Sequence, residues 1–358
     1  DAIAAVGELA SSRIVAAALK SHGLAAEWVD ARKVMVTTAE HTAAPPLMEE
    51  TEARMNAELV PLLARRIIPV LGGFVGATAD GVTTTLGRGG SDYSAAIVGS
   101  CLGASEIQIW TDVDGMLTAD PRLVPTAQVV PELSFDEASE LAFFGAKVLH
   151  PATIVPAMAS NIPVRILNSR RAEVRGTLIT AKRPVTSSPL TAVATKRNVT
   201  VVDITSTRML MVHGFLHKLF AVFEQHATSV DVVTTSEVSV SVTVDDVRRL
   251  PRILEDLQSF AEVQSSSDLA VLCVVGQGIQ GDATFVGRLL EAIGPVPIRM
   301  LSQASQRRNI TIVIPDTDLP GVLARVHEEF FPPSSPKPPE PMGYGETARG
   351  SVGEGRPE

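Results

Sequence analysis

The sequence predicts an α/β protein, with a mostly parallel sheet covered by helices on both faces and then two ferredoxin-like modules in tandem. Strand and helix patterns alternate between residues 24 and 166, as expected for parallel strands because each needs a crossover connection. After residue 190 a β-α-β-β-α order occurs twice, with a period of roughly 70 residues. In this repeat Phe215 aligns with Phe285 and Val238 with Ile310.

Composition excludes several classes of protein. With 358 residues, 45% hydrophobic and 20% charged, the chain can bury the cores of two or more domains. Its net charge of −9 gives no general attraction to nucleic acid or to an anionic membrane. No apolar run reaches membrane-spanning length and the start lacks a signal-peptide profile, so we expect a cytoplasmic protein without membrane contact.

The cysteines and histidines also favour a cytoplasmic protein, and one without a structural metal site. Cys101 and Cys273 lie far apart in apolar patterns, and both are expected to be small buried residues of a protein in a reducing compartment. The seven histidines show no metal-ligand spacing with cysteines or acids. We therefore predict no structural metal site.

The first domain begins with a helix over residues 2–22, which ends at His22-Gly23. The chain starts with Asp-Ala-Ile and this helix has no capping sequence before it, so we interpret the start as lying within a domain. The other predicted elements are a strand, turn and short strand (Val34 to Val36) over 24–37, a helix over 49–65, a buried strand over 67–71, a strand over 107–110, a capped helix over 134–144 and a strand over 162–166.

A glycine-rich stretch, Leu71 to Ala96, follows the strand over 67–71 at the end where open α/β sheets bind ligands. We expect Ser91 to cap the next helix, with Asp92 in its first turn. Arg88 and unpaired amide groups would then lie at a helix N-terminus, which favours an anionic ligand. The stretch has neither a P-loop nor a dinucleotide-binding pattern. A tight structural loop is the alternative.

The strand over 107–110 leads into TDVDGMLTADPR, which places Thr111, Asp112 and Asp114 at its carboxyl end. The acidic positions do not alternate and no glutamate closes the loop, which excludes an EF-hand. Asp-Gly and Asp-Pro also start turns for local reasons, so ligand contact and plain turns remain equal alternatives. For Glu8 and Lys147 the residues alone favour solvated side chains, although a lysine facing a phosphate would act as a charge clamp.

The second half contains the repeat and then a low-complexity end. Strands are predicted near 199–205, 230–233, 238–244, 269–275, 298–301 and 310–314, and helices near 215–226, 250–260, 284–293 and 319–331. Such modules leave sheet edges that pair between copies or subunits. The predicted organisation is a domain over 1–182, a linker over 183–190, the paired modules over 191–331 and a disordered tail over 332–358.

Several segments resemble the aspartate kinase family of the amino-acid kinase superfamily, closest to its lysine-sensitive form. In the first half they are TTTLGRGGSDYSAA (Thr83 to Ala96), WTDVDGMLTADPR (Trp110 to Arg122) and FGAKVLHPATI (Phe144 to Ile154). In the second half HGFLHKLF (His213 to Phe220) and SVDVVTTSEVSVSVTVD (Ser229 to Asp245) resemble the ACT regulatory domains of that enzyme. The resemblance spans residues 1 to about 331 and implies an amino-acid-kinase-type sheet followed by tandem ACT domains.

The resemblance implies transfer of the ATP γ-phosphoryl group to the β-carboxylate of L-aspartate, at the head of lysine, threonine and methionine synthesis. Glu8 matches the glutamate that binds the aspartate ammonium group. The matches to the segment holding the substrate carboxylates are Arg88, Gly89, Gly90 and Ser91, with Asp92 beside them. The matches to nucleotide contacts are Thr111, Asp112, Leu117 (often tyrosine in the family), Arg122, Lys147 and Val148. Arg88, Asp92 and Lys147 are the implied catalytic set, and Mg²⁺ would neutralise the phosphate oxygens.

The resemblance also implies feedback control by an amino acid, expected to be L-lysine, and a homodimer or larger assembly through the ACT domains. The implied effector contacts are Met209, Val212, Phe215, Leu216, Ser229, Val230, Asp231, Ser236 and Glu237. Asp231 would take the effector's ammonium group, whereas Val212 stands where the lysine-sensitive form has a hydroxyl. For Met209, Phe215 and Leu216, ordinary core packing is an equal alternative.

The chain also departs from the family pattern. Aspartate kinases begin with a Lys-Phe-Gly-Gly-Thr-Ser segment whose lysine contacts the transferring phosphoryl group, and this sequence has no such segment. By comparison roughly a hundred residues are absent, so we expect the chain as given to be inactive or weakly active. The alternatives are a non-catalytic ACT-containing regulatory subunit, another amino-acid kinase, or a fusion in which the tail links to a second enzyme.

Overall fold

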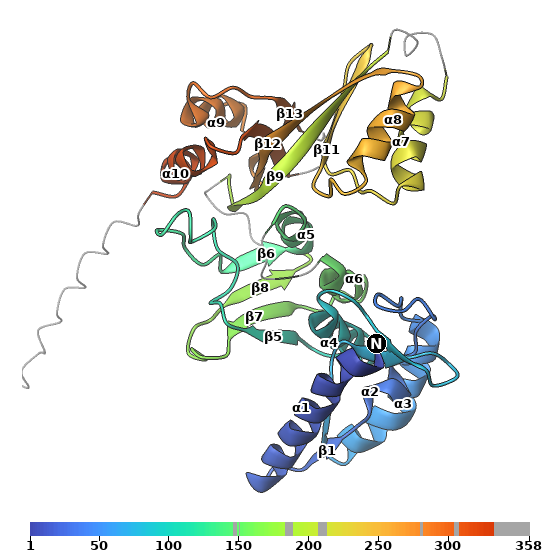
Figure 1. The fold of residues 1–358 in the computed structure, drawn as a ribbon. Helices are drawn as coiled ribbons and strands as arrows, with labels where there is room; N and C mark the ends of the chain where they lie inside the picture. Colours follow the sequence, from blue (N-terminus) through green and yellow to red (C-terminus); the bar gives the residue numbers. More distant parts are fainter. Residues whose placement is uncertain are drawn as a thin grey trace, which may run out of the picture.

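The computed structural model describes residues 1–145, 149, 151–182, 189–206, 213–279, 282–303 and 308–332. Figure 1 shows an N-terminal domain that contains α1 to α6, and a C-terminal module built on one six-stranded sheet. The predicted site residues Lys147, Val148, Met209 and Val212 lie outside the described residues, as do most of the predicted linker and tail.

The N-terminal domain has the predicted α/β architecture. Its helices are α1 (Ala2–Ser21), α2 (Ala31–Val34), α3 (Met48–Ala64), α4 (Gly90–Cys101), α5 (Phe135–Phe143) and α6 (Pro151–Ala159). Its strands are β1 (Ala26–Trp28), β2 (Ile68–Val70), β3 (Val75–Ala77), β4 (Thr83–Thr85), β5 (Ile107–Thr111), β6 (Glu132–Ser134), β7 (Val164–Asn168) and β8 (Thr177–Thr180). Strands β1 and β2 pair in parallel, β3 and β4 form an antiparallel hairpin, and the rest form a sheet in the order β5-β7-β8-β6. In this sheet β5 is parallel to β7 and β6 to β8, whereas β7 and β8 are antiparallel.

Elements with strong local signals were predicted correctly. Helix α1 ends at Ser21 with His22 as its C-cap, and Gly23 follows with a φ of +81° that suits glycine. Helix α5 begins with a capping box, in which Ser134 and Glu137 each satisfy the other's backbone N–H group. Both cysteines are buried, and burial raises the pKa of Cys101 to about 11.

Several local predictions were wrong. Val34 ends a short helix rather than starting a strand, because the Asp30 carboxylate accepts a hydrogen bond from the Arg32 N–H group and caps that helix. Helix α4 begins at Gly90 after Gly89, whose φ is +72°, so Ser91 lies inside the helix and does not cap it. Asp92 is in the first turn, as predicted.

The strand prediction also needs correction. Strand β2 was expected to be buried, but Ile68 is 44% exposed, and among the described residues β2 has β1 as its one strand partner. The three threonines of the glycine-rich stretch form β4, and neither β6 nor β8 was predicted. The last predicted strand of this domain, 162–166, lies two residues further along as β7.

Helix α1 overturns the expectation that no apolar run reaches membrane-spanning length. Its 20 residues are long and apolar enough to cross a membrane by length and composition. The same helix packs on the N-terminal domain through Ala5, Ser12 and Ala16, which are its buried residues. Length and composition alone therefore do not separate a membrane helix from one that packs in an α/β domain.

The C-terminal module repeats one order of elements twice, as predicted. The first copy contains β9 (Ala192–Thr205), α7 (Phe215–Gln225), β10 (Val233–Thr235), β11 (Ser239–Val244) and α8 (Leu250–Gln258). The second contains β12 (Glu262–Val275), α9 (Phe285–Ile293), β13 (Met300–Ser302), β14 (Asn309–Pro315) and α10 (Leu319–Phe330). All six strands form one antiparallel sheet in the order β10-β11-β9-β12-β14-β13.

The two copies interleave rather than follow one another. Residues 200–205 of β9 pair with β11, whereas residues 269–275 of β12 pair with β14. Strands β9 and β12 also pair with each other, so the first half of β9 supplies the fourth strand of the second copy. Each copy then has the four strands of a ferredoxin-like sheet.

The six-stranded sheet is covered on both faces. One face of β12 presents Ala270, Leu272 and Val274 to α9 and α10, and its other face packs Val271 and Cys273 in one cluster with α5. Figure 1 shows α5 between this sheet and the sheet of the N-terminal domain. The fully buried Glu137 on α5 accepts a hydrogen bond from the Thr191 hydroxyl, with 2.6 Å between the oxygens. The two regions therefore share a core.

Candidate functional site

Two glycines after β2 bring the predicted substrate residues together. A Cβ atom at Gly72 would lie 2.9 Å from the carbonyl oxygen of Glu8 on α1. A Cβ atom at Gly73 would lie 2.9 Å from Cα of Ser91 on α4. Side chains at these positions would push the helices apart, so the glycines allow α1 and the start of α4 to meet. Glu8 and Ser91 are thereby held on two sides of one loop.

The start of α4 is fixed by hydrogen bonds. The Ser94 hydroxyl donates to the carbonyl oxygen of Gly90 (2.7 Å) and accepts from the N–H group of Phe74 (2.9 Å). These contacts tie α4 to the glycine loop before β3. The first amide groups of α4 are left without helical partners at this end.

Arg88 lies immediately before this helix start. Its side chain is exposed, and among the described residues it makes no hydrogen bond or ion pair. Ser91 is also exposed, whereas Asp92 is half-buried. The structure thus places a free guanidinium group beside a helix N-terminus, which suits a carboxylate or a phosphate.

The predicted nucleotide residues Thr111 and Asp112 lie at the end of β5. The Thr111 hydroxyl donates to the Asp112 carboxylate (3.2 Å), and the Thr111 carbonyl oxygen accepts from the N–H group of Ser169 (2.8 Å). Asp114, by contrast, accepts from the Asn168 amide (2.7 Å) and pairs with Arg171. Asp114 therefore has a role in the turn, which is one of the two alternatives that the sequence left open. The Asp112 side chain, by contrast, is exposed.

Arg122 and Leu117 lie in the segment between β5 and β6. Arg122 forms an ion pair with Asp120 (2.6 Å), and its side chain is 73% exposed. The hydrogen bonds that the Arg122 guanidinium group donates to the Asp120 carboxylate raise its pKa. Leu117 forms an isolated β-bridge with Val129, which gives this segment the shape of a hairpin.

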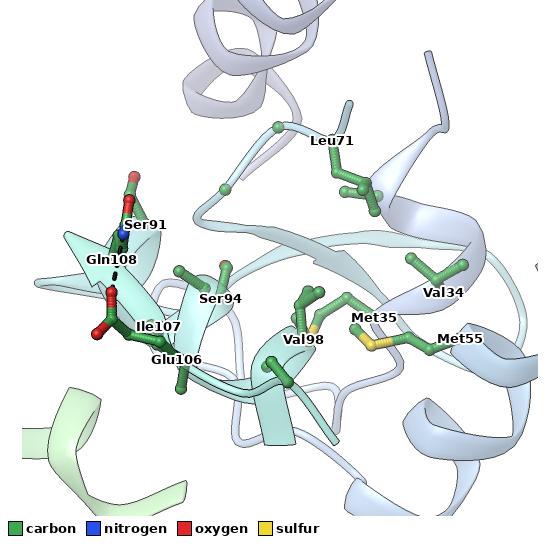
Figure 2. Close-up of a pocket in the computed structure, with 16 residues that line it drawn as sticks. Val34, Met35, Met55, Leu71, Ser91, Ser94, Val98, Glu106, Ile107 and Gln108 are labelled. Atoms are coloured by element: carbon green, nitrogen blue, oxygen red, sulfur yellow. Dashed lines mark hydrogen bonds between the residues drawn. The ribbon is translucent and has the colours of Figure 1, made fainter. Parts of the chain in front are cut away.

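A cavity of about 360 Å³ lies beneath the glycine loop. Figure 2 shows Val34, Met35 and Met55 on one side, Ile107 and Gln108 of β5 on the other, and Ser94 and Val98 of α4 between them. Apolar side chains dominate the lining, so the cavity itself is unsuited to a charged ligand. Gly73 and Ser91 of the candidate site are among the residues that line it.

The structure separates the predicted effector residues into two groups. Phe215 and Leu216 start α7, and Phe215 packs on Phe260, with 5.9 Å between the ring centroids. Phe260 contacts Ser206, which also bonds to Val238 in the β10–β11 turn that holds Ser236 and Glu237. Ser229, Val230 and Asp231 lie at the other end of β10. Five residues of extended chain from Asp231 to Ser236 span about 16 Å.

Asp231 is already paired in this structure. Its carboxylate is 3% exposed and lies 2.6 Å from Nζ of Lys196 on β9, and the same nitrogen lies 2.7 Å from Asp245. Burial alone would lower the pKa of Lys196, but hydrogen bonds to Asp231 and Asp245 raise it. The ammonium group also lies 5.5 Å from the ring centroid of Phe143 at the end of α5. An ammonium site therefore exists at Asp231, and Lys196 occupies it.

Sequence reasoning missed Lys196, Thr118 and His327. Lys196 contacts Asp231 across 35 residues, and the Thr118 hydroxyl contacts a ring nitrogen of His327 across 209. Lys196 lies in a Lys-Arg pair within a strand pattern. The alternation of side chains along a strand indicates which of them share a face of the sheet, but it does not indicate which residues of other elements they contact. No local signal marks Thr118 or His327.

Comparisons with known proteins assign a class to this fold and site. Residues 1–168 match the amino acid kinase family, and residues 272–330 match an ACT domain. The chain is therefore an amino acid kinase domain followed by an ACT-domain module.

Individual relatives narrow this class. Aspartokinase 1, chloroplastic, from Arabidopsis thaliana is 38% identical over 92% of this chain and 60% of its own length. Lysine-sensitive aspartokinase 3 from Escherichia coli is 36% identical over 92% of this chain and 75% of its own length. The chain belongs to the aspartokinase family. It spans about 60% of the length of its plant relatives.

Solved structures agree with this assignment. The structure of E. coli aspartokinase III in complex with aspartate and ADP, the R-state, superposes with a TM-score of 0.82 at 36% identity, covering 91% of this chain and 74% of that one. The same enzyme in complex with lysine and aspartate, the T-state, gives 0.74 at 37% identity over the same shares. This chain is thus more similar to the R-state arrangement.

Proposed function

We propose that the protein is an aspartate kinase, which transfers the γ-phosphoryl group of ATP to the β-carboxylate of L-aspartate. The observation that carries this proposal is the close approach of the Glu8 main chain to Gly72 and of Ser91 to Gly73, which brings α1 and the Arg88–Ser91 segment to one loop. A carboxylate on one side and a free guanidinium group with helix amides on the other match an amino acid that carries one ammonium and two carboxylate groups. The E. coli relative was solved with aspartate and ADP.

In this proposal the chain acts mainly by positioning. Glu8 holds the substrate ammonium group, Arg88 forms a bidentate pair with a carboxylate, and the amides of Gly89 and Ser91 take the other. The N–H group of Gly90 between them donates to the Gly87 carbonyl oxygen (3.1 Å), which fixes the loop. With Arg88, Asp92 and Lys147 complete the proposed catalytic set. Phosphoryl transfer needs little covalent help from the protein, so orientation and charge account for most of the catalysis.

The nucleotide would lie beyond the end of β5. Thr111 and Asp112 are placed there, the hairpin carrying Leu117 and Arg122 follows, and Lys147 and Val148 complete the proposed contacts. The described residues contain no cluster of three or more His, Cys, Asp or Glu that could hold a metal ion. We propose that Mg²⁺ is carried by phosphate oxygens with one or two carboxylates, such as Asp112. When bound, Mg²⁺ supplies neutralisation of the phosphate charge.

We further propose feedback control by L-lysine through the ACT module of a homodimer. The effector residues lie in two groups about 16 Å apart, and β10 lies at the edge of its sheet. Antiparallel pairing of β10 with a second copy, centred on Thr234, would place Asp231 opposite Glu237 of the partner subunit. One effector molecule could then contact both groups. This regulation suits a cytoplasmic enzyme at the head of lysine, threonine and methionine synthesis.

Protein expressed from its complete reading frame, incubated with L-aspartate and MgATP, should form an acyl phosphate that hydroxylamine traps. Arg88→Ala should raise the KM for aspartate about a hundredfold, because a bidentate charged contact is lost from the site, with little change in the KM for ATP. Arg252→Ala, at an exposed arginine of α8 in the C-terminal module, is the matched control. Absence of trapped product would refute the activity, and equal loss for both substrates would refute the role of Arg88.

A further inference from the structure

The segment between β5 and β6 belongs to the core of the other region. Ala119 and Val124 lie in one buried cluster with residues of α9 and α10, at 4% exposure each. The main-chain N–H group of Val193 on β9 donates to the carbonyl oxygen of Thr118 (2.8 Å). A hairpin of the N-terminal domain is therefore docked on the C-terminal module.

One polar contact fixes this docking. The Thr118 hydroxyl lies 2.9 Å from Nε2 of His327 on α10. The two residues are 6% and 2% exposed, so water does not compete for the hydrogen bond. The same hydroxyl accepts from the N–H group of Gln128, and the Thr118 N–H group donates to the Gln128 carbonyl oxygen, both at 2.9 Å. Thr118 thus links the two sides of the hairpin to each other and to α10.

We propose that Thr118 and His327 are positioning residues that hold the nucleotide-contacting hairpin in register on the regulatory module. Leu117 precedes Thr118 directly and Arg122 follows four residues later. A shift of Thr118 relative to α10 would therefore move both proposed nucleotide contacts. The inference rests on the proposed function, because that function assigns Leu117 and Arg122 to the nucleotide. It adds a route by which α10 sets nucleotide affinity.

The geometry distinguishes this role from plain packing. A packing residue at position 118 would need only the volume of the side chain, and valine supplies nearly the same volume. A positioning residue needs the hydroxyl, and serine keeps it. The ring of His327 also packs against the ring of Phe331, with 4.9 Å between centroids, so this contact helps to orient the imidazole that meets Thr118.

The test compares Thr118→Val with Thr118→Ser in the full chain, and uses Thr126→Val, at an exposed threonine of the same hairpin, as the matched control. Binding of MgADP and of L-aspartate is measured by calorimetry, together with amide hydrogen exchange over residues 116–124.

Thr118→Val should weaken MgADP binding about tenfold and speed exchange in the hairpin, since one buried hydrogen bond is lost. Aspartate binding should stay constant, and Thr118→Ser and Thr126→Val should match the wild type. His327→Leu should reproduce the effect of Thr118→Val, and the double variant should add little to either.

Other outcomes overturn the inference. Equal loss of MgADP and aspartate binding with a lower Tm would show that Thr118 only packs. Unchanged binding and unchanged exchange would show that the contact between Thr118 and His327 does not hold the hairpin in place. A wild-type chain that binds aspartate but no MgADP would refute the nucleotide assignment of the hairpin. A chain that binds neither would count against the proposed function itself, and the exchange rates would then decide whether the contact holds the hairpin.

Discussion

The proposed substrate face of the N-terminal domain, around Arg88, and the ammonium site of the C-terminal module, at Asp231, are built in opposite ways. At the substrate face Arg88 is exposed and has no side-chain partner among the described residues, and glycines bring the helices close. At the ammonium site Asp231 is 3% exposed and is already paired with Lys196. The first site is open to its ligand, whereas the second is closed by a group of the same chain.

This difference indicates how the two ligands would act. A substrate at Arg88 adds contacts without breaking any, so binding and the fold are separate there. An effector ammonium group at Asp231 must displace Lys196, whose ammonium group also lies over Phe143 of α5. Effector binding would therefore alter a contact between the C-terminal module and the N-terminal domain.

The largest effect is expected at Gly73. In Gly73→Ala the new Cβ atom would meet Cα of Ser91 at 2.9 Å, so the start of α4 must shift. A displacement of this kind should weaken aspartate binding about a hundredfold and lower the unfolding free energy by about 1–3 kcal/mol. Calorimetric titration with L-aspartate and urea unfolding measure both quantities.

Gly7→Ala is the matched control for this change. A Cβ atom at Gly7 meets nothing within 4 Å, and Gly7 lies inside α1. Alanine there should stabilise the helix by about 0.5–1 kcal/mol and leave aspartate binding intact. Normal aspartate binding by Gly73→Ala would show that the glycine loop does not shape the site.

A smaller effect is expected for Lys196→Met. The variant leaves the buried Asp231 without its cation, so the fold should lose about 3 kcal/mol. L-Lysine should then bind about tenfold more tightly, because it no longer competes with an internal ammonium group. The rise in Tm on adding L-lysine should accordingly exceed that of the wild type.

Lys20→Met, at an exposed lysine near the end of α1, controls for the lost charge. It should change neither stability nor L-lysine affinity. Weaker binding of L-lysine to Lys196→Met would mean that Lys196 helps to hold the effector rather than competing with it.

The smallest effect concerns the contact that joins the two regions. Burial lowers the pKa of His327 below its ordinary value of 6.5, so the unfolded chain binds this proton more readily than the folded one. The contribution of His327 to stability is then complete above pH 6.5 and is lost as the pH falls below it. Urea unfolding between pH 7.5 and pH 5.5 should show a loss that is reduced in His327→Leu. An equal loss in both proteins would assign the pH dependence to other groups.

The sequence revealed those parts of the fold that depend on local patterns. The cap of α5 is visible as Ser134 with Glu137 three residues later, and the repeated module is visible in the apolar spacing of its helices. The interleaving of β9 and β12 was not predictable, because the paired residues lie about 70 positions apart. The alternation of side chains along one strand does not indicate which other strand it pairs with. That β2 pairs with β1 alone among the described strands was missed for the same reason.

The candidate site was predictable only in part. The position of Arg88 before a helix start is a local feature of the sequence, and the structure places it there. The meeting of Glu8 with the glycine loop depends on packing between segments some 64 positions apart, and the family resemblance rather than the residues pointed to it. The contact of Lys196 with Asp231 is tertiary and could not be predicted, because each charged side chain on its own is expected to be solvated.

The central claim is that α1, the glycine loop and the start of α4 form one aspartate site. The most direct measurement is a crystal structure of the protein with L-aspartate and MgADP. The account predicts aspartate between Glu8 and Arg88, with one carboxylate at the first amides of α4 and the nucleotide beyond β5. Aspartate bound elsewhere, or a site left empty at saturating concentrations of both ligands, would contradict it.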